Sequence, residues 1–126
     1  DKTMALWTPY LKAMEYHMTT LPETPEPTRS DCHAWSSLPL YEFTRCWLGV
    51  RAGAPGWRTI EVTPQGCGLP SLSGTVPTPQ GDVRVAWQVK DGVWSLRASA
   101  PAVPVQVRLP DGTEGFFPRG GEIILP

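Results

Sequence analysis

The hydrophobic positions in the first part of the chain recur at helical spacing. Residues 4–18 carry an apolar side chain at about every third or fourth position, which predicts a helix with one apolar face. A second helix is expected over residues 36–48, where Ser36 or Ser37 can cap the start and Gly49 can end it. Their apolar positions are Met4, Leu6, Trp7, Leu11, Met14, Met18, Leu40, Phe43, Trp47 and Leu48. The two faces cannot both be buried against each other, so further protein is expected to cover them.

Beyond Val50 the spacing changes, and apolar side chains alternate with polar ones as they do in half-buried strands. The alternation is regular in residues 82–89 and again in residues 103–109. Turn signals at Asp91-Gly92 and Asp111-Gly112 predict hairpins. About seven antiparallel strands in roughly 70 residues predict a small β-sandwich. The candidate strands are residues 57–63, 72–76, 82–89, 93–99, 103–109, 115–117 and 122–125.

Composition and charge narrow the class of protein. A chain of 126 residues suits one domain, or a small domain with an appendage. A net charge of −1 argues against nucleic acid or an anionic membrane surface as a partner, and no apolar run reaches the length of a transmembrane helix. Cys32, Cys46 and Cys67 have unrelated spacings and no zinc-type pair, so we expect buried free thiols, no metal site and no cofactor.

The loop between the two predicted helices concentrates the candidate chemistry. Pro22, Pro25 and Pro27 exclude a helix from residues 19–29, which predicts a stiff and exposed loop. The loop and the residues after it contain Glu23, Glu26, Arg29, Asp31, His33 and Trp35. Carboxylates that move protons beside an aromatic face are typical of sugar-cleaving sites. The partner carboxylate that such chemistry needs is not evident elsewhere, so we expect the chain to be the tail end of a larger enzyme.

Four groups of residues together resemble bacterial α-L-rhamnosidases. Thr-Thr-Leu-Pro-Glu at residues 19–23 and Ser-Asp-Cys-His-Ala-Trp-Ser at 30–36 resemble the end of that family's catalytic domain. The third group, Leu48-Gly49-Val50-Arg51 with Ala54-Pro55-Gly56-Trp57, resembles the exit from the family's last barrel helix. The fourth group, residues 73–81 with Val83-Arg84-Val85-Ala86-Trp87, resembles the core hairpin of its sandwich.

This resemblance implies a fold and an activity. The family consists of inverting glycoside hydrolases with an (α/α)6 barrel followed by a small β-sandwich domain. The chain is therefore expected to be an α+β fragment, with two helices from the end of the barrel followed by a small antiparallel β-sandwich. Residues 1–50 would hold the last helices and the active-site loop of the catalytic domain, and residues 51–126 the C-terminal sandwich. A rhamnose-containing glycoside and the remainder of the catalytic domain are the implied partners; the compartment is left open.

The resemblance also implies roles for single residues. Glu23 stands where the family has its general base, although Pro22 occupies a position at which many relatives carry tryptophan. His33 stands where a hydrogen bond to the sugar is implied, with helix capping as the alternative. Trp35 could form a wall of the substrate pocket, but a place in the core is the stronger expectation for it. The catalytic acid would belong to an earlier segment, so the lone chain is expected to be inactive.

Simpler interpretations compete with these roles. Without the family, Glu23 is a solvated loop carboxylate; Glu26 and Asp31 are taken as structural or solvated, with Asp31 pairing with Arg29 or holding a backbone N–H. The alternative function is a free-standing carbohydrate-binding or structural module, which would need exposed tryptophans on the sandwich. Trp87 shares a face with valines, so burial in the core is expected instead. Because the helices carry so much apolar surface, part of it should pack on the sandwich, and the isolated chain is expected to self-associate or bind the rest of its enzyme.

Overall fold

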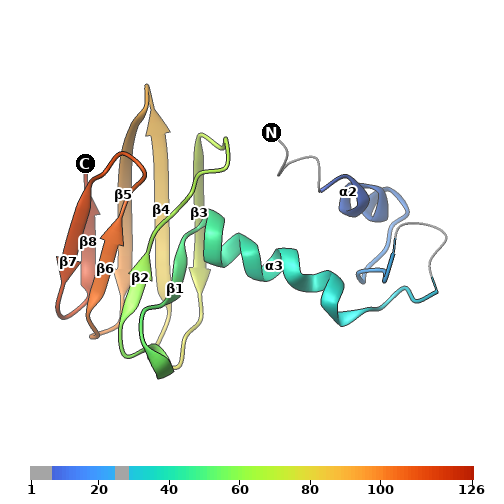
Figure 1. The fold of residues 1–126 in the computed structure, drawn as a ribbon, viewed down its shortest axis with the longest axis horizontal. Helices are drawn as coiled ribbons and strands as arrows, with labels where there is room; N and C mark the ends of the chain where they lie inside the picture. Colours follow the sequence, from blue (N-terminus) through green and yellow to red (C-terminus); the bar gives the residue numbers. More distant parts are fainter. Residues whose placement is uncertain (1–6, 25–28) are drawn as a thin grey trace. The chain divides into compact units, whose positions relative to one another are not determined.

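The computed structural model describes residues 7–24 and 29–126 (Figure 1). The chain divides into two compact units, Asp1–Tyr41 and Glu42–Pro126. The first is helical with a long loop, and the second is a β-sandwich entered through the end of a helix. No helix in the described part of the chain is long and apolar enough to span a membrane.

The first predicted helix is present but shorter than its apolar pattern. Helix α2 covers Thr8–Glu15, with Pro9 in its first turn, where the missing N–H is tolerated. The Tyr16 N–H bonds the Lys12 carbonyl, and His17 then takes a positive φ of 56°, which stops the helix. Met4 and Leu6 lie outside the described residues.

The second predicted helix forms as three consecutive pieces. They are η1 (Ala34–Ser37), α3 (Leu38–Glu42) and the π-helical turn η2 (Phe43–Trp47). The predicted caps are wrong, because the run begins earlier, with His33 at the N-cap position and no side-chain cap. Ser36 and Ser37 instead donate their hydroxyls to backbone carbonyls, those of Pro22 and Ala34. Gly49, with φ of 87°, ends the run as predicted.

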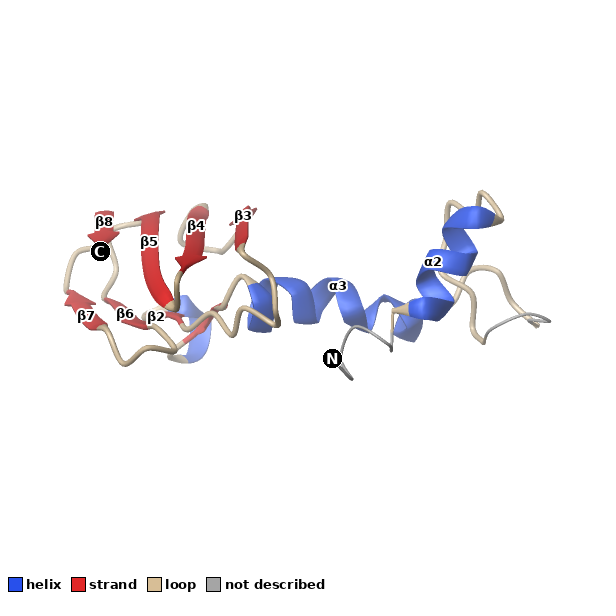
Figure 2. Cartoon of the chain, turned by 90° about the horizontal axis from the view of Figure 1, so that it is seen from above, coloured by secondary structure: helices blue, strands red, loops and turns tan. Residues whose placement is uncertain are grey.

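The second unit is a sandwich of two four-stranded sheets within residues 42–126, seen edge-on in Figure 2. One sheet has the order β1-β2-β6-β7 and the other β3-β4-β5-β8. The strands are β1 (Val50–Ala52), β2 (Ile60–Val62), β3 (Ser71–Val76), β4 (Val83–Lys90), β5 (Val93–Ala100), β6 (Val105–Arg108), β7 (Glu114–Phe117) and β8 (Gly121–Leu125), with the short helix η3 (Pro55–Trp57) after β1.

The pairing is antiparallel throughout these sheets, except between β2 and β6. These two run parallel, with Ile60 opposite Val105 and Val62 opposite Val107. The expected α+β fragment with a small antiparallel β-sandwich is therefore confirmed, and the β2–β6 pair departs from the antiparallel pairing. The reason is topological: after β2 the chain crosses to the other sheet for β3, β4 and β5 and then returns beside β2. Strand β1 was not predicted, because three residues are too few to show alternation.

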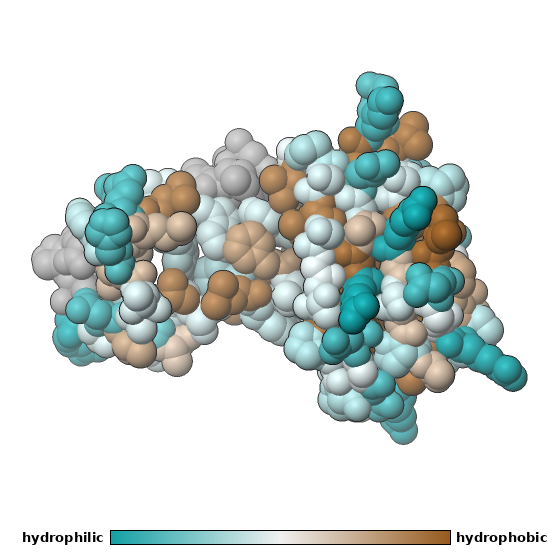
Figure 3. All heavy atoms as spheres, turned by 180° about the vertical axis from the view of Figure 1, so that it is seen from behind, coloured by the Kyte–Doolittle hydropathy of each residue, from teal (hydrophilic) through white to brown (hydrophobic). Residues whose placement is uncertain are grey.

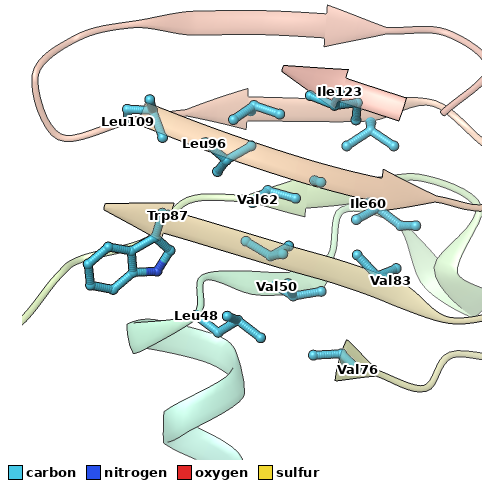
Figure 4. Packing of buried hydrophobic residues seen from close by; sticks show 14 of the residues in the cluster. Leu48, Val50, Ile60, Val62, Val76, Val83, Trp87, Leu96, Leu109 and Ile123 are labelled. Atoms are coloured by element: carbon cyan, nitrogen blue, oxygen red, sulfur yellow. The ribbon is translucent and has the colours of Figure 1, made fainter. Parts of the chain in front are cut away.

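The core lies between the two sheets, where the inward positions of each strand meet (Figure 4). Val83, Val85 and Trp87 alternate along β4 and are all buried, as their pattern predicted. Leu48, at the end of the helical run, also belongs to this core. The Trp87 indole Nε1–H donates to the Trp47 carbonyl over 3.0 Å, which ties the helix end to β4. The core consequently extends from the sheets into the segment that precedes β1.

Candidate functional site

The loop that precedes the second helical run is closed on itself by backbone hydrogen bonds. The His33 N–H donates to the Leu21 carbonyl over 2.8 Å, and the Glu23 N–H donates to the Ser30 carbonyl over 2.9 Å. The Thr20 hydroxyl adds a bond to the Asp31 carbonyl. Two arms of the chain are thus held side by side. The resulting frame fixes the backbone that leads into Glu23.

The peptide before Glu23 is also attached to the helical run. Ser36, in η1, donates its hydroxyl to the Pro22 carbonyl over 2.6 Å. Pro22 itself has a restricted φ, which removes one source of backbone freedom at this point. Pro22 therefore stiffens the approach to Glu23. A sequence interpretation that treats Ser36 as a helix cap misses this bond, because the acceptor lies fourteen positions back in the chain.

The Glu23 carboxylate is held by Arg29 through both of its oxygens. Arg29 Nε donates to Oε2 over 2.8 Å, and Nη2 bonds to Oε1. The side chain of Glu23 is only 18% exposed, whereas that of Arg29 is 81% exposed. A bidentate guanidinium–carboxylate pair fixes the plane of the carboxylate as well as its position. The expectation that Asp31 pairs with Arg29 is wrong, since Arg29 pairs with Glu23.

His33 and Trp35 form an aromatic pair at the start of the helical run. Their ring centroids are 5.3 Å apart and their planes differ by 25°, so the rings are stacked. His33 is half-buried, but Trp35 is 77% exposed. The stronger expectation for Trp35, a place in the core, is therefore wrong for the chain as it stands. Glu23, His33 and Trp35 all belong to the same unit, on or directly after the closed loop. Glu26 lies outside the described residues.

The three thiols are free, but their surroundings differ from the expectation of burial. Cys32 is exposed, while Cys46 and Cys67 are half-buried in the second unit. Desolvation raises the pKa of both the Cys46 and Cys67 thiols, and the Glu42 carboxylate, which accepts a bond from the Cys46 thiol, raises the Cys46 pKa further. Within residues 7–24 and 29–126, no three His, Cys, Asp or Glu side chains gather in a way that could hold a metal ion.

The outer face of the β3-β4-β5-β8 sheet carries two shallow hollows, of about 650 and 400 Å3. Small side chains such as Ser73 and Ala86 line both, and Arg97 borders both. Seen from behind, the molecule shows hydrophilic atoms spread over its surface with hydrophobic patches between them (Figure 3). None of the residues predicted for the site lines these hollows. Trp87 and Trp94 are at most 8% exposed, as the core interpretation of Trp87 predicted.

The chain is similar to a known protein family and to solved structures of its members. Residues 49–122 match the family model described as "Bacterial alpha-L-rhamnosidase C-terminal domain". The GH78 family rhamnosidase of Bacillus sp. GL1 is 35% identical over 87% of this chain and 13% of its own, with a TM-score of 0.74. The α-L-rhamnosidase from Dictyoglumus thermophilum is 28% identical over 82% of this chain and 12% of its own, with a TM-score of 0.69.

A third solved structure supports the fold alone. The α-L-rhamnosidase from Aspergillus terreus is 23% identical over 94% of this chain and 16% of its own, with a TM-score of 0.76. The chain thus spans roughly an eighth of the length of the first two solved relatives, as the 13% and 12% coverages show. No curated protein matched the chain.

Proposed function

The chain belongs to the family of bacterial α-L-rhamnosidase C-terminal domains, and on that premise we propose that it is the C-terminal part of a glycoside hydrolase that removes terminal α-L-rhamnose from glycosides or polysaccharides. The observation that carries the proposal is the closed loop. It fixes the carboxylate of Glu23 and leads directly into the helical run that precedes the sandwich.

In this proposal Glu23 is the general base of an inverting reaction. Its carboxylate accepts a proton from the water that attacks the anomeric carbon, while an acid on an earlier segment protonates the leaving oxygen. The two carboxyl groups of an inverting enzyme stand roughly 6.5–9.5 Å apart, which leaves room for that water. His33 would hydrogen-bond the sugar, and Trp35 would present its exposed ring to the pocket. The base alone cannot complete the reaction, so the lone chain is inactive.

The exposed apolar side chains of the first unit support the remainder of the catalytic domain as the partner. Leu11, Met14, Leu38 and Leu40 are each more than half exposed, as is Trp35. So many large apolar side chains exposed in one small unit support a surface that another protein segment covers. The alternative, a free-standing sugar-binding module, has less support because Trp87 and Trp94 are buried and offer no flat platform on the sandwich.

The decisive experiment measures hydrolysis of an aryl α-L-rhamnoside by the enzyme that contains this chain. Glu23→Ala should lower kcat by roughly 10²–10⁴-fold, the usual worth of a general base. Azide, a nucleophile that needs no deprotonation, should restore turnover in that variant. The configuration of the first sugar released, followed by proton NMR, should be inverted.

The matched control is Glu114→Ala, because Glu114 is also paired with an arginine but lies on the sandwich. This control should keep wild-type activity. Full activity of Glu23→Ala, or a retained configuration at the anomeric carbon, would refute the proposed mechanism. Turnover by the isolated chain that is lost in Glu23→Gln would refute the placement of the acid on an earlier segment.

A further inference from the structure

We infer that Arg29 is a positioning residue for Glu23, and that it sets the direction in which the carboxylate accepts the proton of the attacking water. The inference rests on the proposed function of Glu23 as the base and goes one step beyond it. The sequence alone gave Arg29 no role in the reaction. Its assignment comes from the two contacts that its guanidinium makes with Glu23.

The geometry of the ion pair restricts how the Glu23 carboxylate can turn. A glutamate held by one hydrogen bond can still turn about its terminal torsion, which is a broad and soft one. Two donors from one rigid guanidinium, Nε to Oε2 and Nη2 to Oε1, fix that torsion. Each carboxylate oxygen has more than one acceptor direction and thus keeps capacity for a water after accepting one N–H. Arg29 thereby selects which directions remain open to the water.

The register of the loop brings Arg29 beside Glu23. The Glu23 N–H bonds to the Ser30 carbonyl, so the residue immediately before Ser30 is brought beside Glu23. Ser36 holds the same peptide group from its other edge, through a bond to the Pro22 carbonyl. The backbone frame accordingly places the guanidinium and the carboxylate together without help from the second unit. Geometry of this kind is what a general base needs, since small misplacements of a reacting group are expensive in rate.

The ion pair between Arg29 and Glu23 adds little to the stability of the fold. Arg29 is 81% exposed, and an ion pair with so exposed a partner contributes little to folding. A role limited to holding the loop together therefore predicts almost no effect of its removal, because the backbone bonds of the loop remain. A positioning role predicts a large effect on kcat with little effect on folding. These two interpretations separate cleanly in one set of measurements.

The experiment uses the enzyme that contains this chain, with Arg29→Met, Arg29→Lys, Glu23→Ala and the double variant Glu23→Ala/Arg29→Met. Initial rates are measured with an activated aryl α-L-rhamnoside, together with the melting temperature of each variant. Arg108→Met is the matched control, because Arg108 Nε also bonds a glutamate, Glu114, over 2.6 Å in an exposed pair on the sandwich.

Arg29→Met should lower kcat roughly ten- to a hundredfold with KM changed less than about threefold, and shift the melting temperature by no more than about 2 °C. Arg29→Lys keeps the positive charge but not the paired N–H donors of the guanidinium, so its kcat should lie between those of the wild type and Arg29→Met. In the Glu23→Ala background, Arg29→Met should change the residual rate less than about twofold, because there is no carboxylate left to position. Arg108→Met should behave as the wild type.

Three results overturn the inference. A wild-type kcat in both Arg29→Met and Arg29→Lys would overturn the inference and leave the proposed role of Glu23 intact. An equal loss from Arg29→Met with and without Glu23 would show that Arg29 acts on the fold or the sugar directly. Full activity of Glu23→Ala would remove the proposed base itself, and the inference with it.

Discussion

Replacing Gly49 by alanine tests how the helical run is joined to the sandwich. Gly49 has φ of +87°, and a Cβ placed there would lie 2.2 Å from the Pro64 nitrogen and 2.5 Å from the Thr63 carbonyl carbon. Both of these are backbone atoms, so no side-chain rotation can relieve the overlap. The Gly49 carbonyl also accepts the Thr63 N–H over 2.8 Å, and Leu48 and Val50 on either side are at most 4% exposed.

The magnitude follows from three contributions. A positive φ in a residue with a Cβ costs about 1–2 kcal/mol. Moving the strand end away from residue 49 loses one backbone hydrogen bond, worth about 1 kcal/mol. Displacing the two buried neighbours adds about 1–3 kcal/mol of repacking cost. Gly49→Ala should therefore destabilise the sandwich by about 3–6 kcal/mol, a large share of the stability of a small domain.

Urea unfolding followed by tryptophan fluorescence measures this loss, because Trp87 and Trp94 become exposed when the sandwich opens. Gly92→Ala is the matched control: Gly92 has φ of +80°, but a Cβ there would meet nothing within 4 Å. Gly92→Ala should lower the free energy of unfolding only by the cost of the positive φ, about 1–2 kcal/mol. Equal losses in Gly49→Ala and Gly92→Ala would show that the contact with Pro64 does not constrain the junction.

Three further predictions concern thiols, acid and association. A disulfide reagent at neutral pH should modify Cys32 fast, and Cys46 and Cys67 slowly, because burial raises the pKa of these two thiols; three equal rates would contradict this. The Thr113 N–H, 2.9 Å from Oδ1, holds the pKa of Asp111 below its usual value. Because the pKa of Asp111 is depressed in the folded state, its ionised carboxylate stabilises the fold at neutral pH, and this stabilisation is lost as the pH falls below about 4. At pH 7 the wild type should therefore unfold at a higher urea concentration than Asp111→Asn, and the difference should shrink in acid. A difference that does not depend on pH would refute the linkage. Sedimentation at micromolar concentration should show self-association of the isolated chain, and a clean monomer that binds no hydrophobic dye would contradict it.

The sequence predicted the parts of the sandwich whose physics is local. Alternation in β4 and β5 is long enough to define both strands, and Asp91 and Gly92 both take the positive φ that their hairpin turn requires. The parallel pairing of β2 with β6 could not be predicted, since β2 has three residues and its partner is chosen by tertiary packing. In a strand this short, the alternation of apolar and polar residues is too brief to identify a partner strand that is distant in the sequence.

The candidate site was predictable only in part, and for a different reason. The identity of Glu23 and His33 as candidates came from resemblance, whose motif residues are close together in the chain. The partner of Glu23 was missed because loop closure, rather than helical or strand spacing, brings Arg29 beside it. Ser36 was misassigned for the same reason: a serine before a helix can cap it or reach back to an earlier carbonyl, and only the folded loop decides between them.

The exchange of strands between the two sheets has a consequence for biosynthesis. As the ribosome delivers the chain, β1 and β2 emerge early, yet β2 gains its second neighbour only with β6. The other sheet stays open until β8 arrives to pair with β5, and Ile123 of β8 is fully buried in the finished core. Neither of the two sheets is therefore complete until its last strand, β7 or β8, has been synthesised. The nascent strands must stay soluble until β8 has left the exit tunnel, and closure, which depends on non-local pairing, is then expected in milliseconds to seconds.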